Sequence, residues 1–236
     1  TAAVSTVVVH HLEHSRSQRV LWLLEELGVP YELRRYARDP RTRLAPPELK
    51  AVHPLGKSPV ITHGDITVAE SAAILEYLVE TFPPPRDGDL AGLLPPPGSA
   101  AHRANRFWLH FAEGSLMNWL VMKLVFVQIP RQRMPFFARP VARAISQQVL
   151  QRLVDPNIDA ALELLEQTLS DRPWLTGEHL ALADFQMSFA IEAAVARSGS
   201  QTADRYPHLS AYRARYRARP AYQRALAKGG PEIMKI

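Results

Sequence analysis

Residues 56–71 read Gly56-Lys57-Ser58-Pro59-Val60-Ile61-Thr62-His63-Gly64-Asp65-Ile66-Thr67-Val68-Ala69-Glu70-Ser71. Two short β-branched segments in this stretch flank Gly64-Asp65, a pair that is typical of a β-hairpin turn. Pro59 has no N–H group to donate to a central ladder, so we expect it at the start of a strand. The spacing of apolar residues predicts a helix from about Glu70 to Thr81. The stretch is therefore predicted to form a hairpin followed by a helix.

The preceding residues alternate strand and helix signals. Thr6 to Leu12 has the β-branched character of a buried strand, and a helical pattern follows Ser15 as far as Leu27. Gly28-Val29-Pro30 ends that helix, because glycine lies just past it and proline beyond. Tyr31 to Tyr36 is predicted as a second strand, and a short helix is predicted near residues 48–52. Residues 6–82 thus have the order β-α-β-α-β-β-α.

The composition changes after this unit. Residues 82–99 contain six prolines and three glycines, as expected of an exposed linker. A stripe of Leu109, Ala112, Leu116, Leu120 and Leu124 predicts one long helix, and further helices are expected at about 136–170, 181–197 and 207–227. We predict an α/β domain over 1–83, a Pro-rich linker over 84–99 and an all-α domain over 100–236.

The overall composition is that of an ordinary water-soluble globular protein. Of 236 residues, 47% are hydrophobic and 22% are charged, so we expect a sizeable core that needs no disulfide bond or structural metal ion for stability. The absence of cysteine excludes disulfides, cysteine-ligated metals and protein-thiolate chemistry. A net charge of +5 favours anionic partners without identifying them. No apolar run reaches the ~18 residues of a membrane helix, and Val7-Val8-Val9 is too short for a signal-peptide core.

Three polar motifs each have a structural and a functional interpretation. Ser15 with Gln18 fits a helix capping box, but a hydroxyl at a helix N-terminus can also stabilise an anion. Ser58-Pro59 fits an edge turn, or a cis-proline that presents the main chain of Ser58 to a ligand. Glu70-Ser71 fits a helix cap, or a clamp in which Ser71 holds a carboxylate and Glu70 attracts an amine.

These features, in this order, resemble the glutathione transferase superfamily over nearly the whole chain. The order of elements, Ser-Pro before the third strand and Glu-Ser at the third helix match that family's thioredoxin-like domain, and the remainder resembles its helical domain. The run from Glu113 to Met117, together with the first helix, is similar to the fungal and bacterial branch. The resemblance implies a cytoplasmic, homodimeric enzyme that uses glutathione as co-substrate and conjugates it to small and largely apolar electrophiles, without a metal.

The resemblance also implies roles for particular residues. Ser15 would be the catalytic residue and would hold the glutathione sulfur, with Arg16 and the helix dipole in support. The glutathione-binding residues would be Lys57, Ser58, Pro59, Glu70 and Ser71, with Arg41, Arg43 or His53 as further neighbours of the glycine carboxylate. The wall of the electrophile pocket would include Leu12, Glu13, His110, Gly114 and Met117. The family's usual Ser or Thr three residues before Asp184 is replaced by Ala181, so one helix cap is expected to be lost.

Several alternatives stay open at this level. The same site could support glutathione-dependent peroxidase or isomerase chemistry, and a related fold could serve as a binding module without catalysis. Four arginines between Arg213 and Arg219 could suggest nucleic-acid binding, but residues two apart on a helix do not share a face, so we expect a solvated terminal helix instead. His10, His11 and His14 lack the carboxylate and convergent spacing that favour a metal site. Phe107, Trp108, Phe111 and Trp119 are expected in the core.

Overall fold

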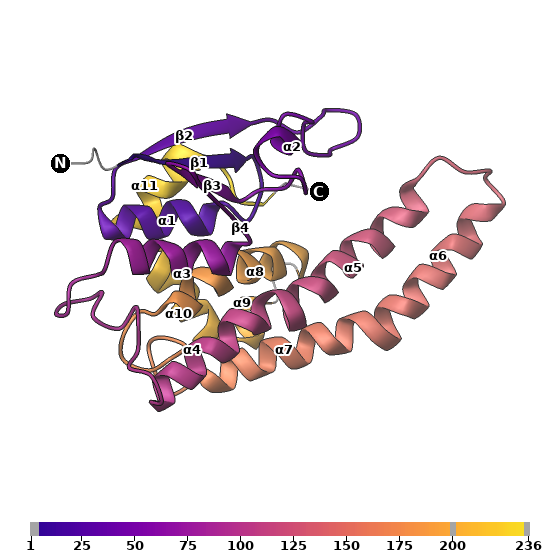
Figure 1. Ribbon diagram of the computed structural model, residues 1–236. Coiled ribbons are helices and arrows are strands. Elements are labelled where there is room, and N and C mark those ends of the chain that lie inside the picture. Colours follow the sequence, from indigo (N-terminus) through magenta and orange to yellow (C-terminus); the bar gives the residue numbers. More distant parts are fainter. Residues whose placement is uncertain (1–4, 199–201, 234–236) are drawn as a thin grey trace.

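A four-stranded mixed sheet lies at the centre of the first half of the chain (Figure 1). The structure is a computed structural model that describes residues 5–198 and 202–233. The strands have the spatial order β2-β1-β3-β4 and the bounds β1 (Val7–Leu12), β2 (Tyr31–Tyr36), β3 (Val60–His63) and β4 (Ile66–Ala69). β1 pairs with β2 in parallel and with β3 antiparallel, so Val9 lies opposite both Leu33 and Ile61. The predicted hairpin is confirmed, and Pro59 directly precedes β3.

Two helices cover one face of this sheet. They are α1 (Gln18–Leu27) and α3 (Ser71–Thr81), while the short α2 (Leu49–Val52) precedes β3. Alternate β1 residues Val7 and Val9 are buried in the same core as the apolar faces of these two helices. Gly28 ends α1 in the left-handed conformation (φ 64°), and its N–H donates to the carbonyl of Leu24, as the sequence predicts. The thioredoxin-like α/β unit is thereby confirmed.

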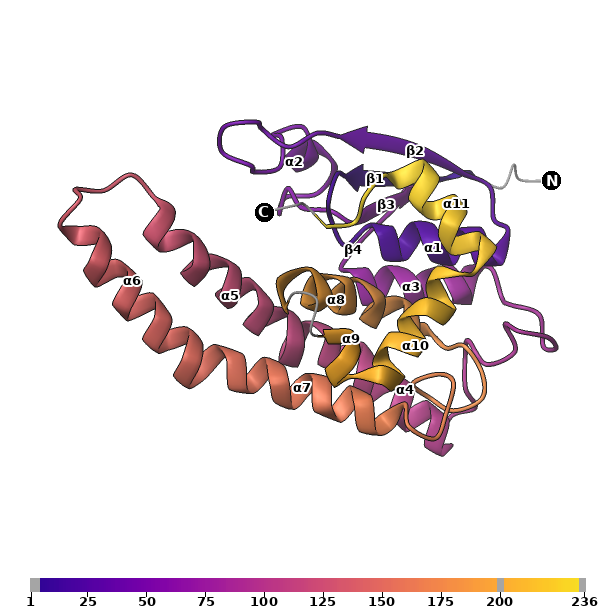
Figure 2. The same ribbon diagram turned by 180° about the vertical axis from the view of Figure 1, so that it is seen from behind.

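Helices make up the second half of the chain. They are α4 (Ala100–Phe111), α5 (Asn118–Gln128), α6 (Ala138–Val149), α7 (Asp155–Thr168), α8 (Leu182–Ser198), α9 (Thr202–Arg205), α10 (Pro207–Arg217) and α11 (Pro220–Gly229). Two π-helical segments, 112–117 and 150–154, join α4 to α5 and α6 to α7. Both ribbon views show α5 and α6 running out from the body as a long pair (Figures 1 and 2). The prediction for Phe107 is wrong, because this side chain is 50% exposed, whereas Trp108 is buried.

The C-terminal helices are not the solvated helix that the sequence suggested. Tyr212 and Tyr216 of α10 are fully buried. α10 ends at Arg217, and α11 begins at Pro220 and lies against α1, as both ribbon views show (Figures 1 and 2). Ion pairs accompany this contact: Arg219 binds Glu26, and Arg224 binds Glu25 at 2.8 Å. The arginines of this region therefore hold helices together.

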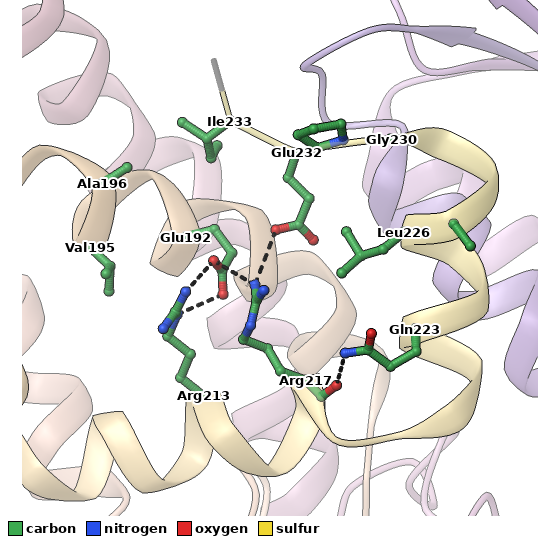
Figure 3. A pocket seen from close by; sticks show the side chains of 12 residues that line it. Glu192, Val195, Ala196, Arg213, Arg217, Gln223, Leu226, Gly230, Glu232 and Ile233 are labelled. Carbon is green, nitrogen blue, oxygen red and sulfur yellow. Dashed lines mark hydrogen bonds and ion pairs between the residues drawn. The ribbon is translucent and has the colours of Figure 1, made fainter. Parts of the chain in front are cut away.

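Two further arginines of α10 line a cavity of about 570 Å³ between α8, α10, α11 and the segment after α11 (Figure 3). Arg213 donates to both oxygens of Glu192, at 2.8 and 2.7 Å, and Arg217 lies 2.9 Å from the same carboxylate. Glu232 lies 4.0 Å from Arg217. Burial, followed by repulsion from Glu192, raises the pKa of Glu232 to about 7. The charged groups of this cavity are thus paired with one another.

Asp184 at the start of α8 compensates for the missing cap at Ala181. Its carboxylate accepts hydrogen bonds from the backbone N–H groups of Ala181 (2.8 Å) and Leu175 (3.1 Å), and from the hydroxyl of Tyr212 (2.8 Å). Asn105 of α4 accepts from the N–H of Ala183 at 2.8 Å and so satisfies a donor in the first turn of α8. The carboxylate of Asp184 and the side chain of Asn105 therefore satisfy backbone donors at this helix start.

Candidate active site

Ser15 lies in the turn between β1 and α1, and its side chain is 6% exposed. Its hydroxyl oxygen accepts a hydrogen bond from the N–H of Ser17 (3.3 Å) and lies 2.8 Å from the Ser17 hydroxyl. The predicted capping box is wrong, because α1 begins at Gln18 with Ser17 as its N-cap and has no side-chain cap. Gln18 N–H instead donates to the backbone carbonyl of Ser15, at 3.4 Å. The Ser15 hydroxyl therefore does not accept the hydrogen bond from the Gln18 N–H that a capping box requires.

The Ser58–Pro59 peptide bond is cis, so the expected cis-proline is confirmed. The Ser58 hydroxyl donates to the carbonyl of His10 (2.8 Å) and accepts from the N–H of Leu12 (3.1 Å). These two hydrogen bonds hold the side chain of Ser58 against β1. The Ser58 hydroxyl also lies 3.5 Å from that of Ser15.

Glu70 and Ser71 begin α3 in an unusual backbone conformation. Glu70 has φ 72° and ψ 122°, outside the regions that non-glycine residues commonly adopt, and its side chain makes no capping hydrogen bond. Such conformations cost roughly 1–3 kcal/mol and concentrate at functional sites. Ser71 is 4% exposed, and its hydroxyl accepts a hydrogen bond from Arg19 at 3.0 Å. The hydroxyl hydrogen of Ser71 remains available to an acceptor in the cavity.

A cluster of charges connects this helix start to the second domain. Glu113, in the first π-helical segment, accepts from Arg16 (2.9 Å) and from Arg19 (2.6 Å). Burial lowers the pKa of Arg19 to about 10, so this fully buried guanidinium still carries its charge at neutral pH. Burial acts to raise the pKa of Glu113, but the two guanidiniums outweigh it and hold the pKa below its usual value. Arg19 thus links Glu113 to Ser71.

Two cavities meet beside Ser15. The first, about 230 Å³, is lined by residues that include Pro59, Glu70, Ser71 and Glu113. The second, about 380 Å³, is lined by residues that include Leu12 and Ser15. Four residues line both cavities: Arg16, Leu55, Lys57 and Ser58. The two cavities are therefore adjacent, and we refer to them together as the groove, with Ser15 in one part and the start of α3 in the other.

The structure brings together one set of predicted residues and separates another. Lys57, Ser58, Pro59, Glu70 and Ser71 all line the first cavity, together with His53. Arg41 and Arg43 are not among the lining residues of either cavity.

The electrophile wall is only partly as expected. Leu12 lines the second cavity, whereas Glu13 accepts from the N–H of Arg38 at 2.9 Å and fixes the loop after β2. Three expected wall residues line neither cavity, because Met117 is buried in the core and His110 and Gly114 lie on the exposed side of the helix.

Three residues at the site were not among the predicted site residues. Phe189 of α8 and Arg38 of the loop after β2 line the second cavity, and Glu113 lines the first. Phe189 and Glu113 reach the site from helices that are distant in the sequence, so only the packing of the two domains reveals them. Within residues 5–198 and 202–233, no group of three or more His, Asp or Glu side chains is arranged to hold a metal.

Comparisons with known proteins agree with this geometry. Residues 5–80 match the family model of the glutathione S-transferase N-terminal domain, and residues 120–220 match that of the C-terminal domain. Glutathione S-transferase 3 of Schizosaccharomyces pombe is 36% identical over 192 residues, which are 80% of this chain and 74% of that protein. The chain belongs to the glutathione S-transferase family. Glutathione S-transferase 1 of Saccharomyces cerevisiae is 31% identical over 86% of this chain and 87% of its own length.

Solved glutathione transferases share the whole fold. The enzyme of Actinobacillus pleuropneumoniae superposes with a TM-score of 0.73 at 28% identity, over 95% of this chain and 93% of its own. A glutathione transferase of Phanerochaete chrysosporium, solved with oxidised glutathione, has a TM-score of 0.74 over 97% of both chains; at 18% identity it supports the fold alone. The expected two-domain fold and glutathione transferase activity are thereby confirmed, and the peroxidase, isomerase and binding-module alternatives are not favoured. No helix in the described part of the chain has both the length and the apolar character needed to cross a membrane.

Proposed function

We propose that this enzyme is a serine-type glutathione transferase in which Ser15 stabilises the thiolate of glutathione bound along the groove. The observation that carries the proposal is that the two cavities are adjacent and share Lys57 and Ser58 in their lining. A tripeptide with a charged head, a peptide backbone and a thiol requires three kinds of partner in a row. The groove offers them in the order Glu70-Ser71, Ser58 and Ser15.

The γ-glutamyl head of glutathione fits the start of α3. Its carboxylate would accept from the Ser71 hydroxyl, whose own acceptor position is occupied by Arg19 at 3.0 Å. Its ammonium group would lie between the carboxylates of Glu70 and Glu113, which both line the first cavity. The cysteinyl backbone would pair with the main chain of Ser58, and the glycine carboxylate would approach Lys57 and His53.

The sulfur would then lie at Ser15. A hydroxyl that donates to a charged sulfur favours thiolate over thiol, since a charge-assisted hydrogen bond stabilises the anion. Lowering the thiol pKa by ~2 units corresponds to ~2.7 kcal/mol. The guanidinium of Arg16 lines both cavities and adds positive potential beside the sulfur.

The electrophile would enter the second cavity. Leu12, Leu44, Leu55 and Phe189 give this cavity an apolar wall, which suits small, largely apolar electrophilic carbons. Membership of the fungal and bacterial branch is supported by the two yeast relatives and the Actinobacillus neighbour.

A homodimer in the cytoplasm completes the proposal. The α5–α6 pair carries apolar side chains that are exposed in the single chain, among them Val125 (50%), Phe136 (86%) and Val141 (60%). Exposed apolar surface on this scale is typical of an interface. The absence of cysteine is compatible with a reducing compartment.

Calorimetric titration with S-methylglutathione tests the binding mode directly. Ser71→Ala removes a hydrogen bond to a charged group, a change that costs ~1.5–3 kcal/mol, so we expect the affinity to fall about tenfold or more. Glu70→Gly removes the carboxylate and also the backbone strain of a non-glycine residue at positive φ. It should therefore weaken glutathione binding while raising the melting temperature. Affinities within twofold of wild type for both variants would contradict the proposed position of the head group. Glu76→Gly, on the same helix but outside both cavities, serves as the binding control.

A further inference from the structure

A chain of buried hydrogen bonds leads away from Ser15 into the interior. The Ser15 and Ser17 hydroxyl oxygens are 2.8 Å apart, and the Ser17 hydroxyl lies 2.5 Å from Nδ1 of His11. On the other side of the ring, Nε2 of His11 lies 2.7 Å from the backbone carbonyl of Gly229, at the end of α11. The three side chains are 6%, 0% and 3% exposed, respectively. The hydrogen-bonded chain therefore leads from the groove, at Ser15, to the C-terminal helix through side chains that are almost fully buried.

The carbonyl of Gly229 determines the direction of every hydrogen in this chain. A carbonyl only accepts, so Nε2 of His11 must carry a hydrogen, and neutral His11 then has a bare Nδ1. The Ser17 hydroxyl donates to that nitrogen, and since its single hydrogen is used, its oxygen accepts from Ser15. In this state the hydroxyl hydrogen of Ser15 points toward Ser17 and away from the groove.

This direction has a consequence for glutathione. While His11 is neutral, the free position on Ser15 is an oxygen lone pair, which can accept a hydrogen bond from a thiol but cannot donate one to a thiolate. Protonation of Nδ1 of His11 would reverse the direction of both hydrogen bonds, so that His11 donates to Ser17 and Ser17 donates to Ser15. We propose that the thiol of glutathione supplies this proton, which is relayed through Ser15 and Ser17 to Nδ1 of His11.

The step is balanced at each atom. The S–H bond breaks and leaves its electron pair on sulfur, and its proton bonds to the Ser15 oxygen. The former Ser15 hydrogen passes to Ser17, and the former Ser17 hydrogen passes to Nδ1 of His11. The products are a thiolate that accepts from Ser15 and an imidazolium that donates to Ser17 and Gly229. After the thioether leaves, the proton returns by the same path to water in the groove.

The surroundings of His11 suit a neutral resting state. Burial is the main cause that lowers the pKa of His11, and Arg35 of β2 and His14 act in the same direction. The carbonyl of Gly229 on α11 and the carboxylate of Glu13 oppose them. His11 therefore rests neutral with a bare Nδ1, and the thiolate formed at the far end of the hydrogen-bonded chain would offset the cost of its positive charge. Ser17 and His11 are positioning residues, since only Ser15 touches the sulfur.

Nitrogen NMR of histidine-labelled enzyme tests the relay in the wild-type protein. At a pH above the pKa of His11 in the free enzyme, binding of glutathione should protonate Nδ1 of His11. S-methylglutathione has no thiol proton and should leave Nδ1 unprotonated. The His11→Gln variant assigns the signal. An unprotonated Nδ1 in the presence of glutathione, at a pH where ultraviolet absorbance shows bound thiolate, would overturn the relay.

Substitutions along the hydrogen-bonded chain provide a second test of the relay. Ser17→Ala interrupts the chain but leaves Ser15 in place, so the pKa of bound glutathione should rise by one unit or more, a tenfold loss of thiolate below the midpoint. His10→Gln is the matched control, because His10 is equally buried on the same strand but bonds to Tyr36 and Thr62 instead. An unchanged midpoint in Ser17→Ala would also overturn the relay.

The relay rests on the proposed role of Ser15, and the two can fail separately. If Ser15→Ala raises the pKa of bound glutathione but Ser17→Ala does not, only the relay is wrong. If neither variant changes that pKa, both proposals are wrong.

Discussion

Removal of the Glu113 carboxylate should destabilise the protein far more than removal of a similar carboxylate on the surface. Glu113 lies 2.6 Å from Arg19, whose side chain is fully buried, and two Arg19 nitrogens, Nε and Nη2, have no partner within the described structure. In Glu113→Ala the guanidinium would keep only the Ser71 hydroxyl as an acceptor. Breaking a buried pair typically costs 3–5 kcal/mol, and because Glu113 is 35% exposed we expect about 3 kcal/mol. At ~2–4 °C per kcal/mol for a chain of this size, the melting temperature should fall by roughly 6–12 °C.

Differential scanning calorimetry at one protein concentration measures this change. Glu32→Ala is the matched control, because Glu32 also binds an arginine, Arg34, but both side chains are more than half exposed. Such a surface pair contributes ~0–1 kcal/mol, so the control should lose at most a few degrees. The double variant Arg19→Met with Glu113→Leu removes both charges and should recover much of the loss. If Glu113→Ala melts within a few degrees of Glu32→Ala, the buried pair does not stabilise the domain contact as described.

Two further outcomes follow from burial in the second domain. Burial is the main cause that raises the pKa of Asp184 to about 6, so its contribution to stability is present below about pH 4 and is lost as the pH rises through 6. In Asp184→Asn the unfolding free energy, measured by denaturant titration, should depend less on pH in this range, by up to ~3 kcal/mol. A pH dependence parallel to that of the wild type between pH 4 and 7 would contradict this role of Asp184. At Gly229 an added Cβ would lie 2.4 Å from Gln18 and 2.7 Å from Leu21, so Gly229→Ala should destabilise by ~1–3 kcal/mol. Gly114→Ala meets nothing within 4 Å and should stabilise by up to ~1 kcal/mol; equal melting temperatures for the two variants would refute the close approach of α11.

The sequence predicted the first domain well because its signals are local. Gly28 ends a helix, Gly64-Asp65 makes a hairpin turn, and Pro59 precedes a strand through conformational preferences of single residues. The predicted binding residues Lys57, Ser58, Pro59, Glu70 and Ser71 line one cavity for the same reason, because they lie on consecutive elements of one unit.

The errors concern contacts between distant parts of the chain. Ser15 matches a capping box in sequence, but the helix begins later and its hydroxyl bonds to Ser17 instead. Phe189 lines the groove because α8 packs against α1, and Met117 is buried because α8 also packs against the π-helical segment 112–117. The burial of Tyr212 and Tyr216 likewise depends on α8, which no periodicity within α10 reveals.

The titration of bound glutathione in wild type and Ser15→Ala tests the central claim most directly. Ultraviolet absorbance of the thiolate, measured against pH at saturating glutathione, gives the pKa of the bound thiol. We expect Ser15→Ala to raise this pKa by ~2 units, equivalent to ~2.7 kcal/mol, and to slow conjugation of an electrophile at neutral pH in proportion. Ser15→Thr keeps a hydroxyl and should retain part of the effect. If Ser15→Ala has the same titration midpoint and the same turnover as wild type, Ser15 does not stabilise the thiolate.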